Sequence, residues 1–199
     1  FRYSDYTIRE YIRNFIMSTL ETNLIQPSSG TTLTVGASGD TLALGSGVKQ
    51  SNLLTPAFEA YLSSAQSVSD ATDTKVQCDT EVFDSDNCYD NSTNYRFTPT
   101  VAGKYLVYVN LLGKASGNNY LASMTPTIYK NGSEYAASTT QFYTNYEKQH
   151  TIMISHIIDM NGSSDYVEFY GYVNITAGSA TFSVDSVKAT SFGAYRIGT

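Results

Sequence analysis

Apolar residues occupy both faces of a segment between positions 104 and 112 of this chain. If the segment is a strand, one of its faces carries Tyr105, Val107, Val109 and Leu111. The opposite face carries Leu106, Tyr108 and Leu112. An antiparallel strand with one face in water alternates apolar and polar residues instead. The pattern therefore predicts a strand that packs in a sandwich core on one side and is covered by another copy of the chain on the other.

Short strands separated by turns follow one another from Pro56 onward. The expected strands cover residues 57–62, 74–83, 95–98, 104–112, 123–130, 134–140, 147–159, 165–176, 180–189 and 191–197. Turn signals such as Asn131-Gly132, Asn161-Gly162 and Ala177-Gly178 separate several of them. About ten short strands without an intervening helix predict an all-β sandwich or barrel.

The pattern has a helical period near the N-terminus, in residues 4–25. A single apolar stripe is formed by Ile8, Ile12, Phe15, Ile16 and Leu20. Thr7 and Glu10 fit a capping box, and Pro27 supplies a stop signal. A lone helix must bury such a stripe. Residues 1–27 are therefore expected to form an amphipathic helix that packs on the β domain, forms a bundle with its copies, or docks into a larger assembly.

Residues 28–55 are rich in Gly and Ser and contain two similar segments. TLTVG and TLALG repeat at a nine-residue spacing, so that Leu33 corresponds to Leu42 and Val35 to Leu44. Short alternating segments with Gly turns cannot bury a face alone, and such repeats favour a short β shaft that is intertwined between copies. A flexible Gly/Ser linker is the alternative. The expected division of the chain is 1–27, 28–55 and 56–199.

The charge and hydropathy of the chain exclude two kinds of partner. The formal net charge of −6 argues against a nucleic-acid partner, because phosphate binding needs clustered Lys and Arg. No apolar run of about 18 residues occurs, so no segment is expected to span a membrane.

Candidate chemical groups are few. The two histidines, His150 and His156, lie in or beside one expected strand, and no GxSxG, Walker A or dinucleotide motif is present. Histidines in the core or at an interface are the favoured interpretation, so no catalytic residue and no cofactor are expected. Cys78 and Cys88 are interpreted as two buried thiols. A disulfide between them is the alternative.

An acidic loop and four sequons complete the candidate sites. Asp84, Asp86 and Asp90 place hard oxygen ligands close together, and calcium is the metal that they would suit. The spacing is not that of an EF-hand, so a solvated turn is favoured over a metal site. The sequons begin at Asn91, Asn131, Asn161 and Asn174. Three of them lie in expected turns, where Asn and Ser are common without glycosylation.

Five pieces of the sequence follow one another between residues 56 and 198. The pieces are Ala57-Phe58 in AFEAYLSS, Lys75-Val76, the block from Tyr89-Asp90 through FTPTVAG to Tyr105, IYKNG at 128–132, and SFGAY at 191–195. In this order they resemble the globular head of complement C1q and the tumour-necrosis-factor-like jelly rolls. The resemblance implies a ten-stranded jelly roll that assembles as a homotrimer around a threefold axis.

The resemblance also suggests which side chains form the trimer interface. In residues 165–176 the aliphatic face, with Val167, Phe169, Val173 and Ile175, is expected to fill the sandwich. The tyrosine face is expected to line the trimer axis, because tyrosine offers apolar contact together with a hydrogen-bonding hydroxyl. The expected interface residues are Tyr108, Tyr166, Tyr170, Tyr172 and Tyr195.

The segments before the head suggest where the protein acts. Complement heads follow a collagen stalk, which is absent here, whereas the TLTVGASGDT segment resembles sequences of bacteriophage tail and head fibres. The expected function is that of a non-enzymatic structural protein on the surface of a phage virion. Such a trimeric fibre or decoration protein would attach to capsid or tail proteins through its helix. It would contact a host glycan or protein through residues 113–120 and 138–146.

The alternative is a secreted C1q-like binding module, either a lectin or a cytokine-like ligand. An enzyme such as a polysaccharide depolymerase has the least support.

Overall fold

A computed structural model describes residues 25–30, 33–41, 46, 55–185 and 187–198. The chain divides into two units, Phe1–Val48 and Lys49–Thr199. The expected N-terminal helix, with Ile8, Ile12, Phe15, Ile16 and Leu20, lies outside the described residues, as do Leu42 and Leu44 of the second shaft segment. Among the described residues, no helix combines the length and the apolar character that crossing a membrane requires.

The described residues 33–41 form a tight turn and no strand. The backbone N–H of Asp40 donates to the carbonyl of Ala37 at 3.0 Å, and the Asp40 carboxylate accepts the Ala37 N–H at 2.7 Å. Leu33 and Val35 are exposed. An intertwined shaft pairs strands of different copies, so the β shaft stays a prediction.

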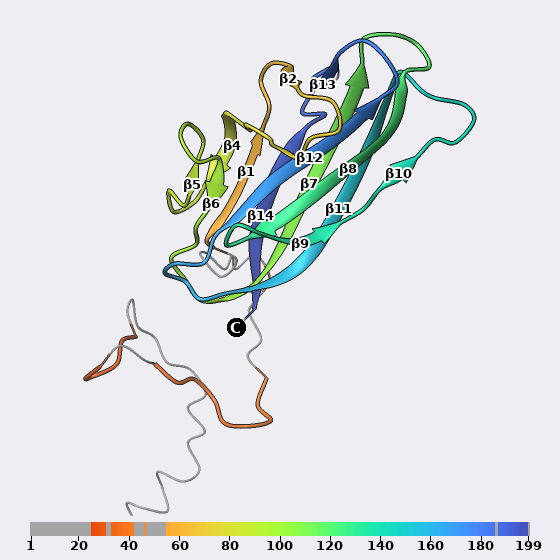
Figure 1. Ribbon diagram of the computed structural model, residues 1–199. Helices are drawn as coiled ribbons and strands as arrows, with labels where there is room; N and C mark the ends of the chain where they lie inside the picture. Colours follow the sequence, from red (N-terminus) through yellow and green to blue (C-terminus); the bar gives the residue numbers. More distant parts are fainter. Residues whose placement is uncertain (1–24, 31–32, 42–45, 47–54, 186, 199) are drawn as a thin grey trace, which may run out of the picture. The chain divides into compact units, whose positions relative to one another are not determined.

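Two antiparallel sheets form a sandwich from residues 55–185 and 187–198 (Figure 1). The strands of the first sheet are β1 (Ala57–Tyr61), β2 (Gln66–Val68), β4 (Thr80–Asp84), β7 (Gly103–Ala115), β11 (Gln149–Met160), β13 (Ala180–Phe182) and β14 (Ser191–Gly198). β7 pairs with β11 along one edge and with β14 and then β13 along the other. β1 and β4 extend the sheet beyond β14, and β2 extends it beyond β13.

β8 and β12 form the centre of the second sheet. Its strands are β3 (Thr74–Lys75), β5 (Tyr89–Asp90), β6 (Arg96–Phe97), β8 (Leu121–Lys130), β9 (Ser133–Ala137), β10 (Thr140–Gln141) and β12 (Val167–Ile175). β9 and β10 pair with the free edge of β8, while β3 and β6 pair with β12. This arrangement confirms the predicted all-β sandwich.

The fold differs from the predicted strands in three segments, the first being residues 134–140, which are divided between β9 and β10. Residues 74–83 were expected to form one strand, but they divide into β3 of the second sheet and β4 of the first. The chain crosses between the sheets here, and it buries Val76 and Cys78 in the core as it does so. Residues 180–189 form a strand only as far as Phe182. The short strands β2 and β5 were not predicted.

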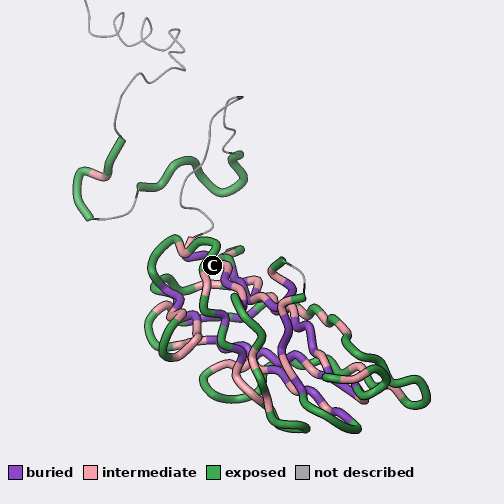
Figure 2. The backbone as a smooth tube through the Cα atoms, turned by 90° about the horizontal axis from the view of Figure 1, so that it is seen from above, coloured by how far each residue is buried: buried purple, intermediate pink, exposed green. Residues whose placement is uncertain are grey.

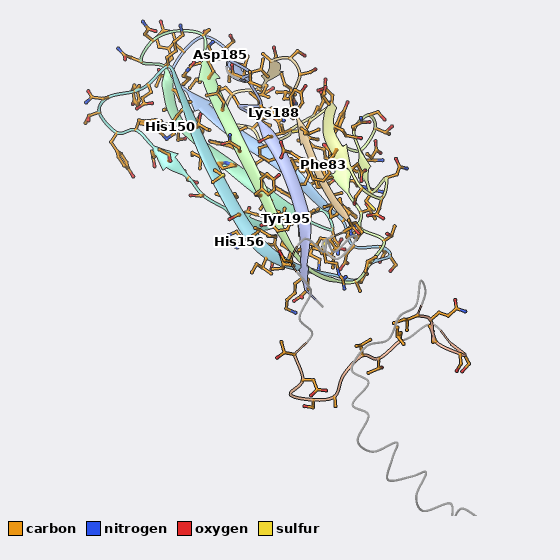
Figure 3. All side chains as sticks on the ribbon, turned by 180° about the vertical axis from the view of Figure 1, so that it is seen from behind. Phe83, His150, His156, Asp185, Lys188 and Tyr195 are labelled. Carbon is orange, nitrogen blue, oxygen red and sulfur yellow. The ribbon has the colours of Figure 1, made fainter. Side chains whose placement is uncertain are left out.

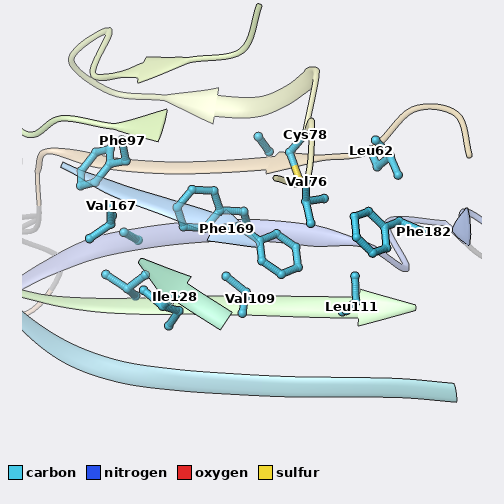
Figure 4. Close-up of a cluster of buried hydrophobic side chains, with 14 of the residues drawn as sticks. Leu62, Val76, Cys78, Phe97, Val109, Leu111, Ile128, Val167, Phe169 and Phe182 are labelled. Atoms are coloured by element: carbon cyan, nitrogen blue, oxygen red, sulfur yellow. The ribbon is translucent and has the colours of Figure 1, made fainter. Parts of the chain in front are cut away.

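The core lies between the sheets and confirms the expected inward faces. Tyr105, Val107, Val109 and Leu111 of β7 are fully buried, and so are Val167, Phe169 and Val173 of β12. The Phe58 ring stacks on Phe97 at 4.7 Å and meets Phe192 edge-on at 4.9 Å. Figure 4 shows Val109 and Leu111 of β7 in this core together with Phe169 of the second sheet and Phe182 of β13 in the first sheet. Figure 2 shows the buried positions running along the strands. Burying each such side chain stabilises the fold by roughly 1.5–3 kcal/mol.

Local sequence explains the hairpin between β8 and β9. Asn131 and Gly132 join β8 to β9, and both have positive φ, at 53° and 77°. Two-residue turns with positive φ at both positions match the twist of hairpin strands.

Cys78 and Cys88 are both free and buried, which confirms the interpretation as two thiols rather than a disulfide. Burial raises the pKa of the Cys78 thiol far above its usual value, so this thiol is not poised for reaction.

Candidate functional site

The outward-facing surface of the first sheet carries a group of apolar side chains. β7, β11 and β14 each contribute two, and we call the six together the assembly face: Leu106, Tyr108, Met153, Ile157, Tyr195 and Ile197. The strand register places Leu106 between Ile157 on β11 and Tyr195 on β14. Met153 is 70% exposed and Ile157 is 55% exposed. Exposed apolar groups of this kind are typical of protein–protein contact surfaces.

Tyr108 lies at the centre of the assembly face and is held there by two neighbours. A Cβ atom at position 193 would lie 2.3 Å from the Tyr108 ring, so the ring needs a glycine beneath it. The Tyr108 hydroxyl donates a hydrogen bond to Glu59 Oε2 at 3.1 Å. Burial raises the pKa of Tyr108 well above its usual value, and the negative charge of Glu59 raises it further. Lys188 Nζ lies 3.6 Å from Glu59 Oε1 and balances its charge.

The edges of this surface carry further apolar and charged groups. Phe83 on β4 is 47% exposed, and Glu59 is paired with it across the strands. At the end of β7, Lys104 forms an ion pair with Asp159 of β11 at 3.0 Å. Phe83, Lys188 and Tyr195 come from separate parts of the sequence and can be located in Figure 3. The arrangement is an apolar centre with a polar rim, which is typical of protein–protein interfaces.

The structure does not bring the five tyrosines of the expected interface together. Tyr108 and Tyr195 lie on the first sheet, whereas Tyr170 and Tyr172 lie on the second. The Tyr170 ring contacts Tyr129 with a centroid distance of 4.1 Å. Tyr166 precedes β12 and lies 4.5 Å from the Arg96 guanidinium, measured to its ring centre. The two groups therefore belong to opposite surfaces of the sandwich.

The acidic loop uses its carboxylates to hold its own backbone. Asp84 Oδ2 accepts the N–H of Tyr89 at 2.8 Å. Asp90 Oδ1 accepts the N–H of Thr93 at 2.8 Å, and its other oxygen accepts the side-chain amide of Asn94 at 2.7 Å. These hydrogen bonds hold the pKa of Asp90 far below its usual value.

The loop does not gather metal ligands. Asp86 accepts a hydrogen bond from the neighbouring Ser85 hydroxyl, and no three His, Cys, Asp or Glu side chains converge anywhere in the described residues. The carboxylates of Asp84, Asp86 and Asp90 therefore hold the turn, and calcium at this loop stays a prediction.

Both histidines are on β11 and contact aromatic rings. His150 meets Phe142 edge-on at 5.2 Å, and its Nδ1 lies 3.4 Å from Glu147 Oε2. His156 meets Tyr135 edge-on at 6.4 Å. Within the described part of the chain, neither histidine hydrogen-bonds a serine or a cysteine, as a nucleophile–base pair would require.

A groove on the second sheet was not predicted from the sequence. It has a volume of about 450 Å³ and crosses β12, β8 and the β9–β10 edge. One side includes Thr139 and Gln141, which belong to residues 138–146, one of the two segments expected to contact a host. The three tyrosines of these two segments, Tyr120, Tyr143 and Tyr146, are exposed. The alternating Ser123, Thr125 and Thr127 of β8 were the sequence feature that could have indicated the groove. The same alternation is also common in strands with one face in water.

Comparisons with known proteins agree with the fold. No family model matches the chain, and no curated protein matches it in sequence. The globular domain of zebrafish complement 1qA is similar in structure, with a TM-score of 0.50 and 10% identity over 71% of this chain and 97% of that one. Murine APRIL in a crystal structure at pH 5.0 is similar with a TM-score of 0.51 and 11% identity, over 71% of this chain and 98% of that one. The protein therefore has a C1q/TNF-like jelly-roll fold.

Proposed function

We propose that this chain is a non-enzymatic head module that assembles as a homotrimer through the outer face of the first sheet. The assembly face carries this proposal, because Met153 and Ile157 leave more than half of their accessible surface in water in a single chain. Covering such side chains stabilises an assembly by about 25 cal/mol per Å² of apolar area. Tyr108 and Tyr195 are the interface tyrosines of this proposal, and Tyr166, Tyr170 and Tyr172 face away from it.

The pair of Tyr108 and Glu59 gives the proposed interface its register. A hydrogen-bonded polar pair within an apolar surface tolerates few alternative alignments, because a shifted partner would leave a polar group buried and unpaired. Lys188 shields the Glu59 carboxylate on its outer side. The pair therefore contributes more to the specificity of assembly than to its strength.

Methionine oxidation tests this proposal directly. Met153 is exposed in one chain, whereas Met124 and Met160 are buried in the core. If the assembly face is covered, brief treatment of the native protein with hydrogen peroxide will oxidise Met153 about as slowly as Met124 and Met160. Peptide mass spectrometry reads the three sites separately. Rapid oxidation of Met153 in the native protein would show that the face is open.

We further propose that the module is displayed on a bacteriophage virion, as a fibre or decoration protein. The sequence order of a predicted amphipathic helix at 1–27, a Gly-rich segment at 28–55 and a head supports this setting, and the predicted helix would attach to capsid or tail proteins. An antibody raised against the head will label intact particles of the phage that carries this gene. Particles that contain no copy of the chain, by mass spectrometry, would contradict the assignment.

The alternative of a secreted C1q-like module depends on the four sequons, and the structure gives two of them another role. Asn131 Nδ2 donates to Asp165 Oδ1 at 2.8 Å, and its Oδ1 accepts the Tyr166 N–H at 2.9 Å. Asn161 Oδ1 accepts the backbone N–H groups of Ser163, Ser164 and Asp165. A glycan on Asn131 would compete for the amide that now holds Asp165. These two asparagines therefore act in the turns, where Asn is common without glycosylation.

A further inference from the structure

The groove on the second sheet is lined almost wholly by polar side chains. Ser123, Thr125 and Thr127 are alternate outward residues of β8 and form its floor together with Tyr172 and Asn174 of β12. Register pairs Tyr172 with Thr125 and Asn174 with Ser123, so the five side chains form one patch across two strands. A hydrogen bond between the hydroxyls of Thr125 and Thr139, at 2.8 Å, ties the floor to the β9–β10 side.

Two residues on the floor are largely buried, and their hydroxyls have no protein partner among the described residues. Ser123 is 6% exposed and Thr127 is 3% exposed. Neither hydroxyl hydrogen-bonds another group among the described residues, and both residues line the groove. No fully buried side-chain oxygen among the described residues lacks a hydrogen bond, so both hydroxyls open into the groove, where each can donate to or accept from a polar ligand.

Two carboxylates lie on opposite sides of this floor. Asp73 lies beside β12, and Glu134 lies on β9. Burial is the main cause that raises the pKa of Tyr129 on β8, and the negative charges of Asp73 and Glu134 raise it further. Lys75 lies 5.7 Å from the centre of the Tyr170 ring, but it is already paired with Glu168. The groove therefore offers strong acceptors for donated hydrogen bonds and no free cation that would attract an anion.

We propose that this groove binds a neutral oligosaccharide. A sugar presents many hydroxyls that donate to carboxylates and exchange hydrogen bonds with Ser, Thr, Asn and Gln side chains, as this lining requires. The Tyr172 ring offers an apolar surface for the C–H groups of a pyranose ring. The volume falls within the range of about 300–1,000 Å³ that is typical of small-molecule sites. The carboxylates disfavour sialylated, sulfated or phosphorylated sugars, and the polar lining disfavours an apolar ligand.

This inference extends the proposed function, because it gives the displayed head a ligand class and a binding site. The groove and the assembly face lie on opposite sheets, so a trimer formed through the assembly face leaves the groove open. A chain that fails to assemble would still bind sugar in solution. Failure of the groove and failure of the assembly are therefore separate results.

A glycan array tests the proposal with the full chain. The fluorescently labelled protein is applied to an array of neutral oligosaccharides together with sialylated, sulfated and phosphorylated ones. We expect binding to at least one neutral oligosaccharide, which is then titrated by calorimetry. Absence of binding to every neutral sugar by the folded protein would overturn the proposal, and so would binding confined to the anionic sugars.

Three variants locate the binding in the groove. Thr127→Val removes a hydroxyl that has no protein partner, so the variant keeps or gains thermal stability while its affinity falls by roughly tenfold. Asp73→Asn and Tyr172→Leu lower the affinity by at least a similar factor. Thr181→Val is the matched control, because Thr181 is a half-buried strand threonine of the first sheet. Unchanged affinity in all three groove variants would place the sugar elsewhere and refute the proposed site.

Discussion

Replacing Ile157 by Asp is expected to dissociate the assembly without unfolding the head. Ile157 faces outward from β11 and is 55% exposed, while its neighbour Ile158 faces the core and is fully buried. Burying a complete Ile side chain stabilises a protein by roughly 1.5–3 kcal/mol. Covering the exposed half therefore contributes about 1–1.5 kcal/mol per copy, or about 3–5 kcal/mol in a trimer. The dissociation constant should rise at least roughly a hundredfold from this loss alone.

The introduced carboxylates add to this effect. An aspartate at position 157 would be buried against apolar neighbours without a partner, which costs several kcal/mol more per site. Sedimentation velocity at micromolar concentrations measures the result, and thermal unfolding monitored by circular dichroism shows that the head remains folded.

Tyr170→Asp is the matched variant on the opposite sheet. It introduces the same charge at a half-buried side chain, so it should leave the assembly intact even if it weakens the contact with Tyr129. If Tyr170→Asp dissociates the protein while Ile157→Asp does not, the second sheet forms the interface and our assignment of the first sheet is wrong.

Two further predictions test the packing and the turn. Gly171→Ala should destabilise the head by about 1–3 kcal/mol, because its Cβ would lie 2.7 Å from the buried Phe182 ring; an unchanged midpoint in urea would show that the core can adapt. Asp90→Asn should lower stability at pH 7 by about 1 kcal/mol through weaker hydrogen bonds to Thr93 and Asn94. Because the pKa of Asp90 is lowered in the fold, the charged form stabilises the protein above its unfolded pKa of about 4, and this stability is lost as the pH falls through the lower folded value. Melting temperatures measured from pH 7 down to pH 2 should therefore converge for the two proteins, and a constant difference would contradict this role.

The parts of the fold that depend on local pattern were predictable from the sequence. The alternation in 104–112 indicated a strand, and β7 buries the expected inward face with Tyr105, Val107, Val109 and Leu111. The covered outer face stays a prediction. The aliphatic face of 165–176 was correctly assigned to the core, because Val167, Phe169 and Val173 are buried. Asn131-Gly132 was correctly assigned to a hairpin turn, because a two-residue turn of this type needs positive φ at both positions.

The assignment of strands to sheets was not predictable from local pattern. Residues 74–83 read as one strand because β-prone residues continue through the point where the chain leaves one sheet for the other. Tyr108 and Tyr170 each lie opposite apolar residues of their own strands, and nothing in that alternation shows that they face opposite sides of the sandwich. The sheet order, which depends on long-range pairing, decides both questions.

The groove depends on the same long-range pairing. Its floor comes from β8 and β12, and its sides come from residues near 73 and from 134–141. Each segment alone resembles an ordinary polar surface. Only the pairing of β10 with β8, and of β3 with β12, places Gln141 and Asp73 on opposite sides of one cavity. Ser123 and Thr127 become groove residues only through that pairing, so they could not be identified as such from the sequence.

The mass of the native protein in solution tests the central claim most directly. Light scattering should be measured for the full chain and for a chain that begins at Pro56, which retains the complete sandwich. If the first sheet forms the interface, both proteins will have three times the mass of their own single chain, which is 21.8 kDa for the full protein. A trimer of the full chain with a monomer of the shorter one would place the assembly in residues 1–55. A monomer in both cases would contradict the proposed trimer itself.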